Sequence, residues 1–264
     1  MAELISDPSL IAQAAKQFTE EPKVEITTEA PSNTEVALPG GFINREGALI
    51  KYAEVRELNG ADEESIARSG STGRALATML QRGLVSLGMD STSKEDLDTL
   101  LSGDRDAILI GIRRATFGNE IGFDLTCPSC KSQGAIVIDL TKDIPIRSLK
   151  DPIEDRTWIY ESKLGPVQVG LPTGATQRKL LENSDKTAAE LNTILLAGCV
   201  SSIDGRPSLG ASTVLKLSWK DREKLVDEIL ERNPGPRLGE VTKACEACGE
   251  TIELPLTLAA LFRV

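Results

Sequence analysis

The chain has 264 residues, 40% of them hydrophobic and 27% charged, which is typical of soluble globular proteins and is long enough to bury a core without disulfides. The formal net charge of −10 at pH 7 repels a phosphate backbone and argues against binding to bare nucleic acid. The sequence contains no histidine, which excludes Ser-His-Asp and Cys-His catalysis, histidine-ligated metals and a histidine pH switch.

The N-terminal residues carry no targeting pattern. Glu3 and Asp7 are acidic and no basic segment precedes an apolar run, so these residues do not resemble a secretory signal. No segment has the roughly 18 consecutive apolar residues that a membrane helix needs. We therefore expect folding in the cytoplasm, where thiols stay reduced, and no membrane partner.

Residues 1–34 are predicted to be an arm outside the folded body. Asp7-Pro8 is typical of a helix start, and the apolar residues from Leu10 to Phe18 recur at helical spacing. The acidic, proline-containing segment from Thr19 to Thr34 resembles a linker. Two interpretations remain, a frayed terminus or a tethered helix that binds a partner, since so short a helix is marginal alone.

The following residues, 35–143, alternate between strand and helix patterns. Strands are predicted at residues 36–41 and 50–56, and helices from residue 62 and over residues 73–82, 93–101 and 104–116. The carboxylates at the helix starts favour the helix dipole, which explains them better than acid–base catalysis does. Gly118 is a candidate C-cap of the last helix.

Residues 144–239 are predicted to be largely helical. A strand from Val167 leads into a helix over residues 177–182, and a second helix covers residues 187–200. Ser218 and Asp221 fit a capping box, followed by an expected buried stripe of Trp219, Leu225, Val226, Ile229 and Leu230. The pattern V-x-L-P-x-G at residues 36–41 recurs with one extra residue at 167–174, which indicates either an internal repeat or two similar strand ends.

Four of the five cysteines form two C-x-x-C pairs, Cys127 with Cys130 and Cys245 with Cys248. A strand is predicted on both sides of each pair, which is the arrangement of a zinc knuckle. Two knuckles supply four thiolates, the ligand set of tetrahedral structural zinc with no open position. The sequence therefore predicts one structural Zn²⁺ per chain, and Cys199, inside an apolar run, is expected to be an inert core residue.

The distance between the pairs leaves alternatives open. Residues 131–244 separate them, whereas the usual four-cysteine signature has about 15 to 20 intervening residues. A shared site requires the fold to bring two hairpins together around an inserted segment. Two separate dithiols, a redox disulfide and a rubredoxin-like iron site are the other interpretations.

No catalytic or cofactor-binding set is found. The sequence lacks G-x-x-x-x-G-K-[ST], and no G-x-G-x-x-G follows a strand. No nucleophile, base and orienting group can be assembled from its patterns. We therefore expect a protein that is not an enzyme, with no catalytic residues.

The fold class is predicted to be α+β, with small sheets, helices and a split four-cysteine zinc-ribbon-like element interrupted by a helical insertion. The predicted division is an arm at 1–34, an α/β body with the first knuckle at 35–143, the insertion at 144–239, and the second knuckle with the C-terminal segment at 240–264. Oligomeric state is not predicted by any of these patterns.

Several segments together resemble one known family, in the order in which they occur: Val36–Gly41, Val55–Glu64, Arg114–Gly118 before the first cysteine pair, Leu171–Gly174, Asp221–Glu223 and Leu261–Phe262. Residues 35–264 are in this way similar to the T-even phage baseplate hub assembly proteins, an assembly-chaperone family with relatives in bacterial contractile injection systems. The resemblance implies non-enzymatic work on the phage tail baseplate, in the cytoplasm of a bacterial host or in the finished particle. It also implies other baseplate, hub or tail proteins as partners.

A second interpretation is a zinc-ribbon protein of regulatory or nucleic-acid-associated function. It requires a basic, aromatic-lined face near the cysteines. Lys131 and Lys243 stand instead among acidic residues, Asp124, Asp139, Glu246 and Glu250. This surrounding charge favours the baseplate interpretation and predicts no nucleic acid partner.

Overall fold

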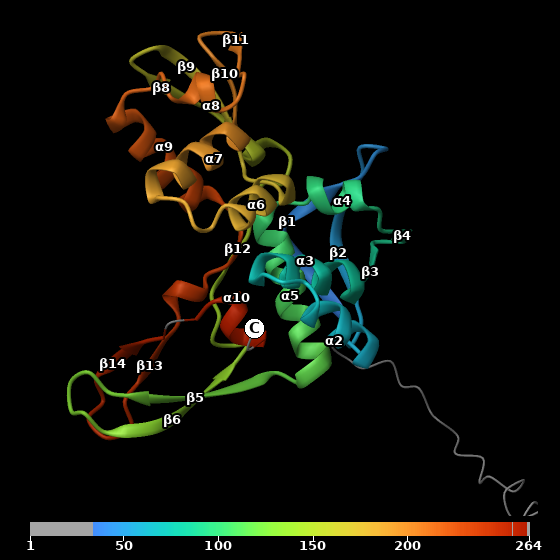
Figure 1. Ribbon diagram of the computed structural model, residues 1–264, viewed down its shortest axis with the longest axis vertical. Coiled ribbons are helices and arrows are strands. Elements are labelled where there is room, and N and C mark those ends of the chain that lie inside the picture. The colour runs from blue at the N-terminus through green and yellow to red at the C-terminus, as the bar shows by residue number, and fades with distance from the viewer. Residues whose placement is uncertain (1–33, 255, 263–264) are drawn as a thin grey trace, which may run out of the picture. The chain divides into compact units, whose positions relative to one another are not determined.

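Residues 34–254 and 256–262 are described by the computed structural model, and all belong to the unit formed by residues 31–264. Figure 1 shows the order of its elements. The predicted helix from Leu10 to Phe18 and nearly all of the predicted linker lie outside the described residues. The predicted divisions at residues 143 and 239 stay predictions.

The first half of the body has the element order ββααββαα. The elements are β1 Glu35–Ile43, β2 Leu49–Val55, α2 Gly60–Ala67, α3 Thr72–Gly83, β3 Leu84–Leu87, β4 Asp90–Ser91, α4 Lys94–Thr99 and α5 Ser102–Phe117. The strands form one antiparallel sheet in the order β1-β2-β3-β4. Each predicted strand and helix of this region is present, with ends shifted by a few residues. Asn59, Ser71 and Ser93 cap α2, α3 and α4 through their side chains.

The same order of elements occurs a second time. The elements are β8 Thr157–Ser162, β9 Gly165–Gly170, α6 Gly174–Glu182, α7 Ala188–Cys199, β10 Val200–Ile203, β11 Arg206–Pro207, α8 Ala211–Val214 and α9 Trp219–Arg232. Their antiparallel sheet has the order β8-β9-β10-β11, matching the first. We call residues 35–117 the first repeat and residues 157–232 the second repeat. The segment predicted to be largely helical thus also contains a four-stranded sheet.

The pairing of the second and third strands follows the same residue-by-residue pattern in both repeats. The third strand of each sheet skips one residue at the same place, leaving Val85 unpaired in one repeat and Ser201 in the other. The matching pairs are Val55↔Leu84, Glu54↔Ser86 and Ala53↔Leu87 in the first repeat and Val169↔Val200, Gln168↔Ser202 and Val167↔Ile203 in the second. A shared bulge in a shared register is a specific feature, because one residue of slip would turn every side chain over.

An internal repeat is therefore present, but the recurring V-x-L-P-x-G pattern aligned the wrong strands. Val36 lies on β1 and pairs with Ala53, whereas Val167 lies on β9 and pairs with Tyr160. Val167 is thus the counterpart of Ala53, on the second strand of its hairpin. The equivalence is carried by hydrogen-bond register more than by residue identity.

A hairpin with one cysteine pair follows each repeat. The first is formed by β5 Glu120–Thr126 and β6 Gln133–Asp139, and the second by β13 Thr242–Ala244 and β14 Thr251–Glu253. Short elements connect the parts, namely η1 Glu154–Arg156, η2 Leu238–Glu240, the pair β7 Ile146–Arg147 with β12 Gly235–Pro236, and the last helix α10 Leu258–Phe262. The two hairpins, far apart in sequence, lie side by side in Figure 1.

Each repeat has its own apolar core, and the hairpins share a third. Leu80, Ile108 and Ile112 are fully buried in the first repeat, and Val167, Leu196 and Leu225 in the second. The third core joins both hairpins to α5 and α10 through residues that include Ile110, Ile138, Leu254 and Leu261. This third core holds the two cysteine hairpins against each other.

The predicted stripe of α9 is only partly buried. Leu225, Val226 and Ile229 are buried, but Trp219 is 85% exposed and Leu230 is 53% exposed. Counted from Leu225 around the helix axis, Val226 and Ile229 lie at about 100° and 40°, whereas Leu230 lies at about 140°, beyond the edge of the buried stripe. Trp219 is the first residue of α9 and has no core opposite it. The prediction was wrong at these two positions.

The two repeats meet where α6 of the second packs against α3, α4 and α5 of the first. Arg178 donates to the Asp98 carboxylate at 2.8 Å, and Gln177 donates to Asp106 at 2.7 Å. Gly174, at the start of α6, approaches so closely that an added Cβ would lie 2.1 Å from the Leu97 carbonyl oxygen. Only glycine fits this contact.

Candidate metal centre

The two cysteine hairpins make the same turn. In the first, the Cys127 N–H donates to the Ser132 carbonyl at 2.9 Å, and the Lys131 N–H donates to the Cys127 carbonyl at 3.0 Å. The second repeats both bonds, from Cys245 to Glu250 at 2.7 Å and from Gly249 to Cys245 at 2.7 Å. Lys131 and Gly249 occupy the same position and both have positive φ, 61° and 75°. This turn directs both sulfurs of a pair to one side.

The structure brings the two pairs together. The Sγ atoms of Cys127 and Cys248 are 3.8 Å apart, as are those of Cys130 and Cys245, and all four lie within 4.8 Å of one another. A regular tetrahedron with Zn–S bonds of about 2.3 Å has S···S edges of roughly 3.8 Å. All five cysteines are free thiols. The four sulfurs are thus spaced to hold one tetrahedrally coordinated ion, and not as disulfides.

Ser132 is a polar neighbour of the sulfurs that the sequence analysis did not identify. Its hydroxyl lies 3.0 Å from the Cys130 sulfur and 3.5 Å from the Cys245 sulfur. The Ser132 hydroxyl lowers the pKa of both thiols, and with the turn N–H groups it brings the pKa of Cys245 to about 6. The only sequence signal was its position two residues after a C-x-x-C pair.

Charge among the sulfurs is uneven. The Glu250 backbone N–H acts to lower the pKa of Cys248, but its hydrogen bonds to the neighbouring cysteines outweigh this and raise that pKa to about 12. Four sulfurs so close cannot all ionise without a cation among them, since like charges disfavour one another's charged form. Cys127 and Cys245 are buried while Cys130 and Cys248 are exposed, so one edge of the group faces solvent.

The hairpins are anchored by groups from other parts of the chain. Lys243 on β13 pairs with the Asp143 carboxylate at 2.7 Å and joins the two hairpin segments. Arg113 of α5 is buried and donates to the carbonyls of Leu261, at 2.9 Å, and Gly118, at 3.1 Å. These bonds fix the C-terminal helix and the start of the first hairpin on α5. Arg113 therefore helps to position the hairpins that carry the sulfurs, without contacting the sulfurs itself.

Cys199 lies apart from this group, as predicted. It is buried in the core of the second repeat, and burial raises the pKa of its thiol to about 12. A buried, protonated thiol is unreactive.

The acidic residues at helix starts have structural partners. Asp62 completes a capping box with Asn59. Asp104 accepts the Gly40 N–H at 2.7 Å, and its counterpart Asp221 accepts the Lys163 N–H at 3.4 Å and the Tyr160 hydroxyl at 3.2 Å. Each thus binds the first hairpin of its own repeat. Burial raises the pKa of Asp104 to about 7.

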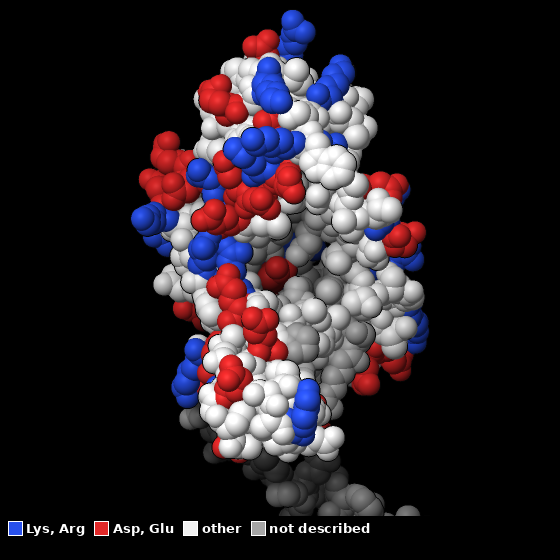
Figure 2. All heavy atoms as spheres, turned by 90° about the vertical axis from the view of Figure 1, so that its left-hand side faces the viewer, with Lys and Arg blue, Asp and Glu red and all other residues white. Residues whose placement is uncertain are grey.

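Acidic and basic side chains alternate on one face of the protein (Figure 2). On the face shown in Figure 2, acidic and basic side chains are interspersed and no area is covered by basic side chains alone. Near the cysteines, Lys243 is paired with Asp143. In the described part of the chain, no helix has both the length and the apolar character needed to cross a membrane.

Comparison with known proteins identifies one family. The model of the family described as T4 bacteriophage base plate protein matches residues 54–231, more than half of the chain. No curated protein and no solved structure matches. The matched region begins at the end of β2, includes the first cysteine pair and ends within α9, before the second pair. By this match the chain belongs to the T4 bacteriophage base plate protein family.

Proposed function

We propose that the protein is a non-catalytic structural or assembly component of a contractile phage tail or tail-like injection system, stabilised by one structural Zn²⁺. The family match supports the baseplate role. The four-sulfur group supports the metal, with Cys127, Cys130, Cys245 and Cys248 as ligands. The protein acts by binding other baseplate, hub or tail proteins, in the bacterial cytoplasm during assembly and as part of the particle if it is retained.

The residues present fit zinc on chemical grounds. The donor set is four sulfurs with tetrahedral spacing, which zinc accepts in closed structural sites. The bound ion would supply a cross-link between two hairpins that residues 131–244 separate, and it would neutralise the thiolate charge. Ser132 and the turn N–H groups favour the ionised form of two of the four thiols, those of Cys130 and Cys245.

Ser132 is expected to tune this site. Ser132→Ala removes the hydroxyl that contacts the Cys130 and Cys245 sulfurs, so metal affinity should fall by about tenfold, as is typical for groups that support ligands. Competition with a chromophoric chelator measures the change. Ser129→Ala, inside the same turn, is the matched control and should leave affinity unaltered. Equal affinity of both variants would show that the hydroxyl does not stabilise the bound thiolates.

The role in tail building is tested in cells. Deleting the gene should prevent the formation of complete tails, and normal tails without it would contradict the assembly role. Deleting residues 1–34, the arm whose helix from Leu10 to Phe18 we propose as a docking element, should leave the body folded and reduce co-purification with other tail proteins. Unchanged tail yield after this deletion would confine the partner surface to residues 35–264.

A further inference from the structure

The contact between the two repeats uses a corner of the first repeat as a socket. We call residues 97–102, from the end of α4 to the start of α5, the first corner. It holds the turn of the second repeat that precedes α6. The Gly174 N–H donates to the Leu100 carbonyl at 2.7 Å, the Ser102 N–H donates to the Pro172 carbonyl at 2.9 Å, and Leu101 forms an antiparallel bridge with Thr173.

The second repeat has a corresponding corner at residues 214–219. The helix after it begins Asp221-Arg222-Glu223 where α5 has Asp104-Arg105-Asp106, and this match places Leu217 opposite Leu100 and Trp219 opposite Ser102. Leu100 and Leu217 are both buried, at 1% and 4% exposure. We call residues 214–219 the second corner.

Nothing in residues 34–254 and 256–262 fills the second corner. The Leu217 carbonyl and the Trp219 N–H, counterparts of the two bonded groups in the first corner, have no hydrogen-bond partner within those residues. Two large apolar side chains of this corner are exposed, Leu215 at 60% and Trp219 at 85%. Polar residues, Asp98 and Ser102, hold the positions of Leu215 and Trp219 in the first repeat. The second corner is therefore more apolar than the first corner, and the first corner is the one that residues 172–174 fill.

The corresponding turn of the first repeat, Leu58–Gly60, has the same backbone conformation as the turn that fills the first corner. It precedes α2 as residues 172–174 precede α6, and both helices begin Gly-Ala. The Asn59 side chain accepts the N–H groups of Ala61 and Asp62, at 3.0 and 3.2 Å, and the Asp62 carboxylate accepts the Asn59 N–H at 3.0 Å. The Leu58 N–H donates to the Thr116 hydroxyl at 3.1 Å. The turn is thus held rigid before any partner binds.

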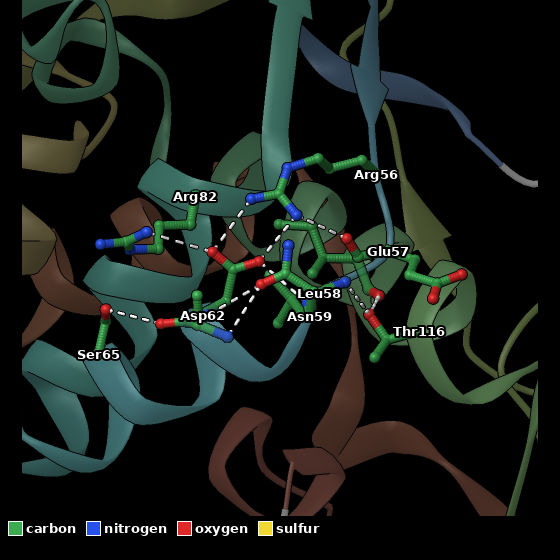
Figure 3. Close-up of polar contacts among 10 residues, drawn as sticks. Arg56, Glu57, Leu58, Asn59, Asp62, Ser65, Arg82 and Thr116 are labelled. Carbon is green, nitrogen blue, oxygen red and sulfur yellow. Dashed lines mark hydrogen bonds and ion pairs between the residues drawn. The ribbon is translucent and has the colours of Figure 1, made fainter. Parts of the chain in front are cut away.

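Figure 3 shows how ion pairs complete this support. Arg56 and Arg82 both point at the buried Asp62 carboxylate, at 2.7 and 3.3 Å. The hydrogen bond from Arg56 holds the pKa of Asp62 at about 2. The Leu58 carbonyl and the Gly60 N–H remain without a partner among the described residues. These are the counterparts of the Pro172 carbonyl and the Gly174 N–H, which bind the first corner.

No contact or backbone angle within the first repeat requires a glycine at position 60. Its φ lies outside the left-handed region, and an added Cβ would meet no atom within 4 Å. Its counterpart Gly174 is required because it presses on the first corner. An exposed acidic residue, Glu63, follows the turn, while exposed Lys216 lies within the second corner and exposed Lys220 directly after it. The charge of Glu63 is therefore opposite to that of the two lysines.

We infer that a second copy of this chain docks here, with the turn Leu58–Gly60 of one copy in the second corner of the next. The contact would repeat the internal one, with the Gly60 N–H donating to the Leu217 carbonyl and the Trp219 N–H donating to the Leu58 carbonyl. Because turn and corner are different surfaces, each copy keeps one of each free, and association continues into a ring or a row of copies. This inference does not depend on the metal or on the baseplate role.

The test uses the purified full-length chain over about 1 to 100 μM, the range of moderate association. Sedimentation velocity should show association that increases with concentration, and the difference in fluorescence between the wild type and Trp219→Ala should report burial of the indole. Trp219→Asp, which spoils the corner, and Gly60→Leu, which spoils the turn, should each abolish association. Met89→Asp, at a side chain that is 100% exposed in the first repeat, should leave it unchanged.

Mixing the two variants gives the decisive result. The Trp219→Asp chain keeps its turn and the Gly60→Leu chain keeps its corner, so together they should form a 1:1 dimer and nothing larger. A wild type that stays monomeric with an exposed Trp219, association that neither substitution reduces, or a mixture that forms no dimer from folded variants would overturn the inference. A monomer that binds a different protein at Trp219 would overturn it as well.

Discussion

Cys130→Ser and Cys248→Ser, one in each hairpin, are each expected to remove the metal and to unfold both hairpins while the two repeats stay folded. The reason is the division of the cores. Cys127 and Cys245 belong to the apolar core shared by the hairpins, whereas the cores of the repeats contain neither. The short second hairpin, three residues in each strand, is too small to be stable without a cross-link.

Two measurements separate the parts. Metal analysis should fall from about one zinc per chain to nearly none, because three thiolates bind far more weakly than a closed set of four. Hydrogen exchange should lose protection in residues 120–139 and 242–253 and keep it in both four-stranded sheets. Cys199→Ala is the control, since it should reduce stability through its core and leave the metal content unchanged.

Contrary outcomes are equally clear. Wild-type protein can be prepared under reducing conditions without metal. If its hairpins keep their protection from hydrogen exchange, the apolar core that they share is sufficient to order them. Iron in place of zinc would give a coloured protein with the same ligands, and it would correct the metal without moving the site. A Cys127–Cys130 disulfide in the isolated protein would favour the redox interpretation.

Local patterns in the sequence were sufficient to predict most elements and the fold class. Helical periodicity and capping residues such as Ser218 depend only on near neighbours, so the predicted helices are found close to their expected ends. The cysteine turns were predictable for the same reason. Their meeting was not, because it depends on the third core, whose residues come from α5, both hairpins and α10.

The repeat shows why sequence similarity can fail where structure is clear. Val36 and its structural counterpart Tyr160 have different side chains. Both nevertheless pack against an apolar core from the first strand of a hairpin. What the repeats share is an order of elements, a bulge and a strand register, which many residues can satisfy. A pattern of identical letters therefore aligned β1 with β9, two strands that occupy different places.

The duplication also changes how the four-cysteine group is understood. Each repeat is followed by one knuckle, and one knuckle offers only two of the four thiolates of a closed site. The full ligand set exists only when the two hairpins meet. The four cysteines therefore join the hairpins that follow the two repeats, and the segment between the cysteine pairs contains the second repeat.

The second large effect concerns the contact between the repeats. Gly174→Ala places a methyl group 2.1 Å from the Leu97 carbonyl oxygen and 2.2 Å from the Arg105 guanidinium. A backbone oxygen cannot move without shifting α4, so the free energy of unfolding should fall by about 3 kcal/mol, at the upper end of overpacking effects. The equivalent change in the first repeat, Gly60→Ala, meets no atom and should be neutral or stabilising by up to about 1 kcal/mol, because alanine favours a helix over glycine.

The two variants form a matched pair, since both place alanine at the first position of a helix after the same turn. Urea unfolding at a low, monomeric concentration measures each, and limited proteolysis between the repeats shows where the structure opens. Gly103→Ala tests a different contact, that of α5 with the segment after α9, because its methyl group would lie 1.6 Å from the Pro234 carbonyl oxygen. A Gly174→Ala chain as stable as the Gly60→Ala chain would mean that the repeats do not press on each other here. The internal contact could then no longer serve as the pattern for one between copies.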